Sequence, residues 1–293
     1  MKRTLALCLA AAAVIAVAGT VVMTGHDHTT TSPPEVGEVL SVSSSRDIVL
    51  PLDRYQHSPD DLTTIDRATA VLARRCVREF GQTWVVPDPL PVPASTGSSR
   101  YGVMDYDEVS TSGYHPPDNG QPKSPDLPEP PPEAMMIYTG KGMTSFGGKQ
   151  IPEGGCLGQA RRTVERDVPA TIQAADLIEL DQSTFVRAQQ DDRVQRVMAG
   201  WRGCMAESGY SYTDVWAANN DIRWSAQKPS QAEIDTAKSD VLCRQRTKLV
   251  DTWFAVETAY QRQAIGERAE QFEALDSGMR IRLENAKSVL ETG

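Results

Sequence analysis

Two short stretches decide the fold, because they match each other and each holds a cysteine. They read Arg74-Arg75-Cys76-Val77-Arg78-Glu79-Phe80-Gly81 and Arg202-Gly203-Cys204-Met205-Ala206-Glu207-Ser208-Gly209. Both follow the pattern R-x-C-x-x-E-x-G, and an aromatic residue, Trp84 or Tyr212, comes eight positions after the cysteine. Because glycine commonly ends a helix, each cysteine is expected about one and a half turns before a helix end.

A second cysteine follows each stretch, after irregular sequence, as Cys156 and Cys243. The simplest interpretation is a duplicated helix–loop–helix unit, over residues 58–168 and 184–293, with chance agreement as the alternative. Four cysteines allow three connectivities, and the repeat favours one bridge within each unit. A metal site fits poorly, because no C-x-x-C occurs and the cysteines are far apart. The predicted disulfides are Cys76–Cys156 and Cys204–Cys243.

Residues 1–23 indicate export. Met1-Lys2-Arg3-Thr4 is positively charged, residues 5–15 are apolar without interruption, and Ala16-Val17-Ala18 offers a small-residue cleavage site. The apolar character continues to residue 23, which is long enough for an uncleaved membrane anchor. We favour cleavage, with the anchor as the alternative; either outcome places the rest of the chain outside the cytoplasm.

The net charge of the chain argues against a nucleic-acid partner. The chain has 293 residues with 30 Lys+Arg and 39 Asp+Glu, a net charge of −9. Removal of residues 1–18 takes away Lys2 and Arg3, which leaves 28 basic and 39 acidic residues and a net charge of −11. An acidic chain without a basic run is not typical of a nucleic-acid binder. Cys8 is removed too, and the even number that remains is typical of disulfides in an exported chain.

Two segments look irregular. Residues 24–45 are rich in Thr, Ser and Pro, which predicts a flexible polar leader. Twelve of the nineteen prolines fall within residues 87–132. Because proline removes a donor and constrains the residue before it, we expect a long extended insertion on the surface there. A plain spacer is favoured over a proline-rich recognition segment.

The remainder, residues 46–293, predicts a single mainly α domain. Ser58 followed by Pro59 is typical of a helix start, and Gly81 of its end. Further helices are expected over residues 155–168, before Pro169, and over 184–208.

The last 64 residues, from Ser230 onward, contain no proline. Ser230-Gln-Ala-Glu233 is a capping-box pattern, and a long C-terminal helix should follow, with bends at Gly266 and Gly278. Its end carries a short heptad seam typical of a coiled coil. We expect residues 267–293 to project as an arm that binds a partner protein. The seam consists of Phe272, Met279, Leu283, Ala286 and Leu290.

No motif predicts catalysis, a cofactor or a metal site. His26 and His28 lie in the leader, and His57 and His115 are interpreted as loop residues. Residues 140–149 resemble a phosphate loop, but Gly148 and Lys149 stand where lysine and then Ser/Thr are required, so we expect a turn.

Acidic residues are interpreted structurally. Asp191 and Asp192 are expected to be solvated on a helix face. Glu79 and Glu207 occupy the same position in the two stretches, which favours pairing with an arginine or a backbone donor over catalysis.

The aromatic residues of the loop in the second unit are the best candidate for ligand or partner contact. Tyrosine and tryptophan bury large areas while keeping a polar group, so they suit a glycan, peptide or protein surface. Packing of the loop over the two helices is the alternative. The residues are Tyr210, Tyr212, Trp216 and Trp224.

Several segments resemble exported proteins of actinomycete bacteria, a group of unknown function. They are Trp201-Arg-Gly-Cys-Met205, Gly209-Tyr210, Arg100-Tyr101-Gly102, Gly113-Tyr114-His115-Pro116 and Gly155-Cys156-Leu157-Gly158. The resemblance covers most of residues 46–270 and implies an extracytoplasmic helical protein, without any catalytic residue.

The sequence therefore predicts a non-enzymatic interaction protein of the cell envelope. One alternative is a small-ligand or cell-wall glycan binder that uses the Tyr/Trp loop. Another is a secreted hydrolase with an acid pair such as Glu79 and Glu207.

Overall fold

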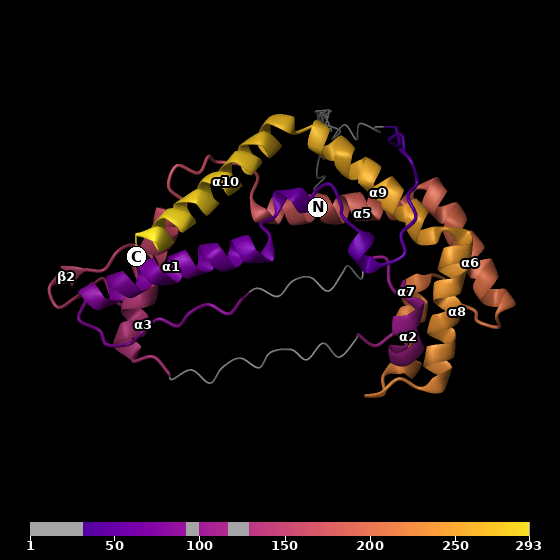
Figure 1. The fold of residues 1–293 in the computed structure, drawn as a ribbon, viewed down its shortest axis with the longest axis horizontal. Coiled ribbons are helices and arrows are strands. Elements are labelled where there is room, and N and C mark those ends of the chain that lie inside the picture. The colour runs from indigo at the N-terminus through magenta and orange to yellow at the C-terminus, as the bar shows by residue number, and fades with distance from the viewer. Residues whose placement is uncertain (1–31, 92–99, 117–128, 293) are drawn as a thin grey trace, which may run out of the picture. The chain divides into compact units, whose positions relative to one another are not determined.

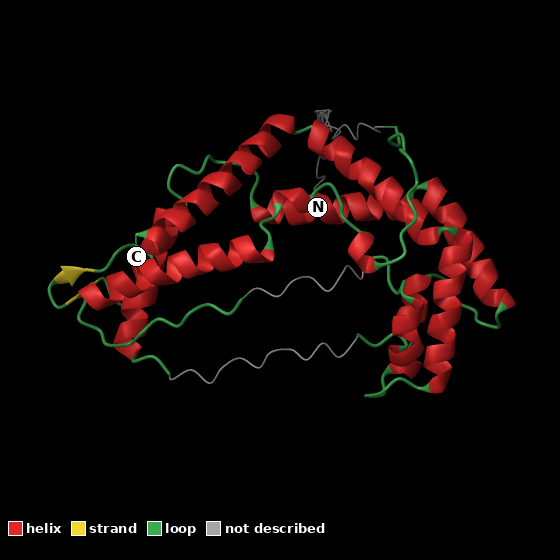
Figure 2. Ribbon diagram, viewed as in Figure 1, coloured by secondary structure: helices red, strands yellow, loops and turns green. Residues whose placement is uncertain are grey.

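The computed structural model describes residues 32–91, 100–116 and 129–292, and it is mainly helical (Figures 1 and 2). Residues 145–146 and 149–150 form one short antiparallel hairpin, β1 (Ser145–Phe146) and β2 (Lys149–Gln150). Three short 3₁₀ helices occur at Ser45–Asp47, Asp53–Tyr55 and Ile222–Trp224. The α-helices are α1 (Pro59–Glu79), α2 (Tyr106–Ser112), α3 (Pro132–Thr139), α4 (Gly155–Val164), α5 (Ala174–Gln190), α6 (Asp192–Glu207), α7 (Val215–Asn219), α8 (Gln231–Thr247), α9 (Leu249–Gly266) and α10 (Ala269–Glu291).

Two disulfides hold helices in pairs. Cys76 of α1 is bonded to Cys156 of α4, and Cys204 of α6 is bonded to Cys243 of α8. This pairing confirms the one predicted. In each pair the first cysteine lies in the last turn and a half of its helix, and the two bonded helices pack against each other.

The start and end of α1 follow the sequence signals. The Ser58 hydroxyl accepts a hydrogen bond from the Asp61 amide at 3.1 Å, and Pro59 occupies the first turn, where no amide donor is needed. At the other end Gly81 has a φ of +71°, the left-handed conformation that glycine adopts without strain.

The helix expected over residues 184–208 is two helices. Asp191 is extended, with φ −64° and ψ 137°, and its carboxylate caps α6 by accepting from the Arg193 amide at 2.9 Å. The carboxylate is buried and also accepts from the Tyr260 hydroxyl at 3.1 Å. The expectation that Asp191 is solvated is therefore wrong, whereas Asp192 is exposed. Helix α4 also ends earlier than expected, at Val164.

The long C-terminal helix is divided into α8, α9 and α10. Lys248, with a φ of +53°, separates α8 from α9, and no sequence signal predicted this break. The break after Gly266 is confirmed. Gly278 lies inside α10, where a Cβ would come within 3.1 Å of the Val168 side chain, so this glycine allows close packing rather than a bend.

Helix α10 does not project from the protein. It lies along α1 and also contacts α4 (Figure 1). Within the heptad seam, Phe272 packs on Tyr55 with ring centroids 4.5 Å apart, and Ala286 is buried with Ala68 and Val164. The expectation of a free arm is wrong, because the apolar face of α10 is covered by its own chain.

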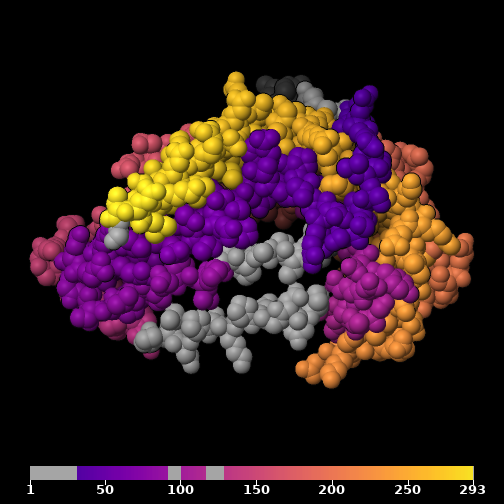
Figure 3. Space-filling view, viewed as in Figure 1, coloured from indigo at the N-terminus to yellow at the C-terminus, as the bar shows by residue number. Residues whose placement is uncertain are grey.

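Part of the expected leader is docked. Val36 and Val42 pack against the main core, and the Val42 amide donates to Asp251 of α9 at 2.9 Å. The indigo start of the described chain lies across the orange helices in Figure 3. The prediction of a flexible leader is thus wrong for residues 33–45, and residues 24–31 lie outside the described ones.

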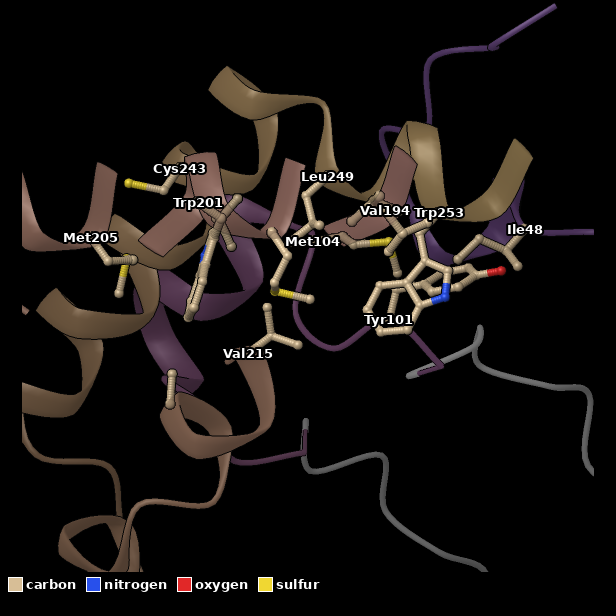
Figure 4. Packing of buried hydrophobic residues seen from close by; sticks show 14 of the residues in the cluster. Ile48, Tyr101, Met104, Val194, Trp201, Met205, Val215, Cys243, Leu249 and Trp253 are labelled. Carbon is tan, nitrogen blue, oxygen red and sulfur yellow. The ribbon is translucent and has the colours of Figure 1, made fainter. Parts of the chain in front are cut away.

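The largest correction concerns the proline-rich insertion. Its residues 100–116 contain helix α2, capped by the Asp105 carboxylate, and their apolar side chains enter the core. Tyr101 is fully buried, and its ring lies 5.4 Å from that of Trp253 (Figure 4). The other buried side chains of this stretch are Met104, Val109 and Tyr114. The prediction of a surface insertion fails here because prolines are absent between residues 94 and 115; the flanking residues 92–99 and 117–128 lie outside the described ones.

The predicted export signal and its predicted cleavage site also lie outside the described residues. Within the described part of the chain, no helix is both long and apolar enough to cross a membrane.

Candidate functional site

The aromatic loop proposed from the sequence is used in packing. Trp224 is buried, and its indole donates to the Ala218 carbonyl at 2.8 Å. Tyr210, Tyr212 and Trp216 are partly buried against the same core, which leaves only part of each ring on the surface. The four side chains thus stabilise the loop over α6 and α8.

Segment 100–116 is attached to the helices by ion pairs of Arg100, one to the partly buried Asp181 and one to the fully buried Glu257. The Arg100 guanidinium donates to Glu257 at 2.8 Å and to Asp181 at 2.8 Å, and the Tyr101 hydroxyl donates to Glu257 at 2.7 Å. Burial raises the pKa of Glu257, and the arginine opposes this shift. Burial, with the neighbouring carboxylate, also raises the pKa of Tyr101. Each buried polar group has partners, so the arrangement reads as a structural attachment.

A second cluster lies on α8. The fully buried Asp240 carboxylate accepts from Trp201 at 2.7 Å, from Tyr114 at 3.1 Å and from Arg244 at 2.6 Å. Arg244 also donates to the Tyr101 carbonyl. The sequence reasoning missed this cluster, although aspartate and arginine four residues apart on a helix are a recognisable pairing signal.

Glu233 does not form the expected capping box. Ser230 caps α8 by accepting from the Glu233 amide at 3.2 Å, but the Glu233 carboxylate is buried and accepts from the Tyr114 amide at 2.9 Å and contacts His115 Nδ1 at 2.7 Å. His115 Nε2 lies 2.8 Å from the Ala226 carbonyl. Both ring nitrogens face acceptors, which favours the imidazolium form. The hydrogen bond to Glu233 accordingly raises the pKa of His115.

The acids of the repeat lie at the surface. Glu207 pairs with Arg246 at 2.6 Å, as the structural interpretation predicted. The Glu79 side chain is exposed, and the backbone carbonyl of Glu79 accepts a hydrogen bond from the Lys149 ammonium at 2.7 Å. The turn expected at residues 140–149 is the β1–β2 hairpin, with Gly147 and Gly148 at its tip.

The strongest candidate site is a groove of about 470 Å³ beside the first disulfide pair, which we call the α1–α4 groove. Four elements form it: side chains of α1 between residues 62 and 70, the extended residues 86–89, side chains of α4 between residues 157 and 165, and Arg282 of α10. His57 closes it at the start of α1 and Tyr138 at the end of α3. Its volume lies within the range of about 300–1,000 Å³ that small-molecule sites occupy.

The extended stretch is held in place by α1. The Arg74 guanidinium donates to the Val86 carbonyl at 2.6 Å and pairs with Asp88. That pairing lowers the pKa of Asp88. Prolines 87 and 89 restrict the backbone between these contacts, so this wall is stiff.

The groove combines an apolar wall with charged ends. Leu62 and Ile65 of α1 and Leu157 and Val164 of α4 supply apolar side chains to its lining. Such a mixture of apolar area and a few polar groups is typical of ligand sites. A second hollow, of about 600 Å³ where α5 begins, is lined mostly by polar side chains and offers less apolar contact.

Two polar atoms at the groove lack partners. Of the five buried side-chain nitrogen and oxygen atoms without a hydrogen-bond partner among the described residues, two are His57 Nε2 and Arg282 Nε. Both residues line the groove. Leaving such a group unpaired costs about 1–3 kcal/mol, more when it is charged. Burial and the charge of Arg282 lower the pKa of His57, which favours a neutral imidazole.

Sequence reasoning did not find this site. His57 was interpreted as a loop residue, and the other lining residues come from segments up to 225 positions away from it. Only folding brings them together, and none of the four segments carries a recognisable motif.

Comparisons with protein-family models, curated proteins and solved structures find no match. Within residues 32–91, 100–116 and 129–292, no group of three or more His, Cys, Asp or Glu side chains is placed to hold a metal ion. The groove is therefore judged on its own geometry.

Proposed function

We propose that this chain is a non-enzymatic interaction protein of the cell envelope that binds a small, partly apolar ligand in the α1–α4 groove. The observation that carries the proposal is the groove itself. It joins apolar side chains to two residues with polar atoms that have no described partner. By contrast, the buried Asp240–Arg244 pair beside the Cys204–Cys243 disulfide is satisfied within the protein.

The location outside the cytoplasm has separate support. The two disulfides are compatible with an oxidising compartment. Residues 1–23 have the composition of an export signal.

The C-terminal segment keeps a role in this proposal, but a different one from the predicted arm. Because α10 packs along α1, its residue Arg282 reaches the groove. Recognition would then involve Arg282 as part of the lining of a site, in place of a projecting arm.

Binding of phenylnaphthylamine, an uncharged dye that fluoresces in apolar surroundings, tests the proposal. We expect the full exported chain to bind it, and Thr69→Phe, which fills the groove from α1, to abolish binding. The matched control is Thr64→Phe on the same helix, outside the groove lining. Both threonine hydroxyls make the same bond to the carbonyl four residues earlier, at 2.9 Å for Thr69 and 2.8 Å for Thr64.

Thermal unfolding of both variants shows whether the fold is retained. Loss of the dye only in Thr69→Phe supports the proposal. Equal binding by the two folded variants, or no binding by the unmodified chain, would overturn it.

A further inference from the structure

The His57–Arg282 end of the α1–α4 groove points to a negatively charged ligand group. Arg282 Nε is sealed from solvent without a partner among the described residues, and a guanidinium N–H bonds best to an anionic oxygen. The Arg282 side chain is otherwise 31% exposed, so the rest of the guanidinium remains within reach of a ligand.

The acid nearest to Arg282 does not saturate it. Glu165 Oε1 lies 3.6 Å from Arg282 Nη2, longer than the roughly 2.7–2.9 Å of a charge-assisted hydrogen bond. Glu165 is also 56% exposed, so water competes for its carboxylate. A ligand anion at this position would replace a weak contact with a direct one.

Besides Glu165, two carboxylates line the groove, Asp88 and Asp66, and Asp61 outside the lining acts on His57. Asp88 is paired with Arg74, and Asp66 lies near the middle of the α1 wall. His57 is favoured as a neutral ring, so it adds no competing charge beside Arg282. The apolar side chains of Leu62, Ile65 and Val164 continue from this end.

We propose that the α1–α4 groove binds an amphiphilic anion, whose carboxylate or phosphate contacts the exposed part of the Arg282 guanidinium while its apolar body lies along α1. This inference rests on the proposed function, because it names the ligand class of the same site. Arg282 is assigned as the residue that distinguishes an anionic ligand from an uncharged one.

Two dyes test the binding function of the groove and its preference for an anion separately. Anilinonaphthalene sulfonate has the ring system of phenylnaphthylamine with an added sulfonate. We expect Arg282→Gln to weaken binding of the sulfonate dye about fivefold, as for a partly exposed ion pair, and to leave the uncharged dye unchanged. The matched control is Arg280→Gln on the same helix, whose ion pair with Asp276 also spans 3.6 Å.

Glu165→Gln provides a test that misfolding cannot imitate. It removes the carboxylate that competes for Arg282, so the sulfonate dye should bind more tightly, by about twofold to fivefold. Higher salt should weaken binding of the sulfonate dye and leave binding of the uncharged dye unchanged. Competition by octanoate, octyl phosphate and octanol then distinguishes a carboxylate from a phosphate ligand.

The outcomes are separable. If Thr69→Phe blocks the uncharged dye but Arg282→Gln leaves the sulfonate dye unaffected, the inference fails and the binding function stands. If Arg282→Gln weakens both dyes equally, Arg282 only maintains the shape of the groove and the inference also fails. Displacement by octanol as strong as by the two anions would overturn it as well.

Discussion

The two disulfide regions have similar covalent links and different interiors. Around Cys204–Cys243, two fully buried tryptophans, Trp201 and Trp253, pack beside the Asp240–Arg244 pair, and the buried charges are bonded within the protein. Around Cys76–Cys156, the apolar cluster is smaller and an open groove remains beside it. A disulfide between two helices therefore closes a dense core in one region of this protein and borders an open groove in the other.

Removal of the Asp240 carboxylate should have the largest effect. Asp240→Ala leaves the Trp201 indole without its acceptor and removes the only carboxylate that is paired with the buried Arg244 among the described residues, while Arg244 keeps the Tyr101 carbonyl. We expect a loss of about 5 kcal/mol in the free energy of unfolding, the upper range for breaking a buried ion pair. Urea denaturation followed by tryptophan fluorescence measures it.

The control is the double variant Asp240→Ala/Arg244→Met, which removes both charges. It should recover more than half of the loss, because no unpaired charge stays buried. A double variant as unstable as the single one would show that the pair is not what makes this region sensitive.

Replacing each disulfide by serines compares the regions directly. Loops of 80 and 39 residues predict losses of about 4.5 and about 4 kcal/mol from chain entropy. Cys76→Ser/Cys156→Ser should also abolish phenylnaphthylamine binding, because the disulfide joins two walls of the groove. Cys204→Ser/Cys243→Ser should leave dye binding intact at temperatures where the chain is folded; the reverse pattern would contradict the comparison.

Two glycines with similar backbone conformations should respond differently to alanine. Gly102, with φ +82°, would place a Cβ 2.9 Å from Arg244 Nη1, whereas Gly81, with φ +71°, has open space around it. We expect Gly102→Ala to cost about 2 kcal/mol and Gly81→Ala about 1 kcal/mol, the latter from backbone strain alone. Equal melting temperatures of the two variants would show that the Arg244 side chain can move away from segment 100–116.

The smallest effect is the pH dependence of the His115–Glu233 contact. Because the pKa of His115 is raised in the folded protein, the contact stabilises fully below the unfolded pKa of about 6.5 and is lost as pH rises through the folded pKa. The stability difference between the unmodified chain and His115→Ala should thus shrink with rising pH, by less than about 1 kcal/mol. A difference that is constant with pH would mean that the imidazolium is not involved.

Local signals predicted much of the fold. The caps of α1 and the break after Gly266 follow from residues close together in sequence, and the disulfide pairing follows from the match between residues 74–81 and 202–209. The break at Lys248 could not be predicted in this way, because neither glycine nor proline marks it and an exposed lysine takes the left-handed conformation there.

The role of segment 100–116 was missed for a different reason. The proline content of residues 87–132 hides a stretch, residues 94–115, that has no proline. Tyr101, Val109 and Tyr114 lie in this stretch and are buried in the structure. What could not be predicted is where they pack, because Arg244 is 143 residues from the Tyr101 carbonyl that it binds. The groove depends on contacts of similar range.

These long separations set an order for folding. The leader residue Val42 is bonded to Asp251, 209 positions later, and Tyr101 needs Trp253 and Glu257 before it can be buried. A chain emerging from its N-terminus therefore holds these residues exposed until α9 has appeared, whereas Cys76 can meet Cys156 far earlier. We expect the α1–α4 disulfide pair to be able to form first and the denser core to close once α9 is available, whereas the groove is completed only when α10 supplies Arg282.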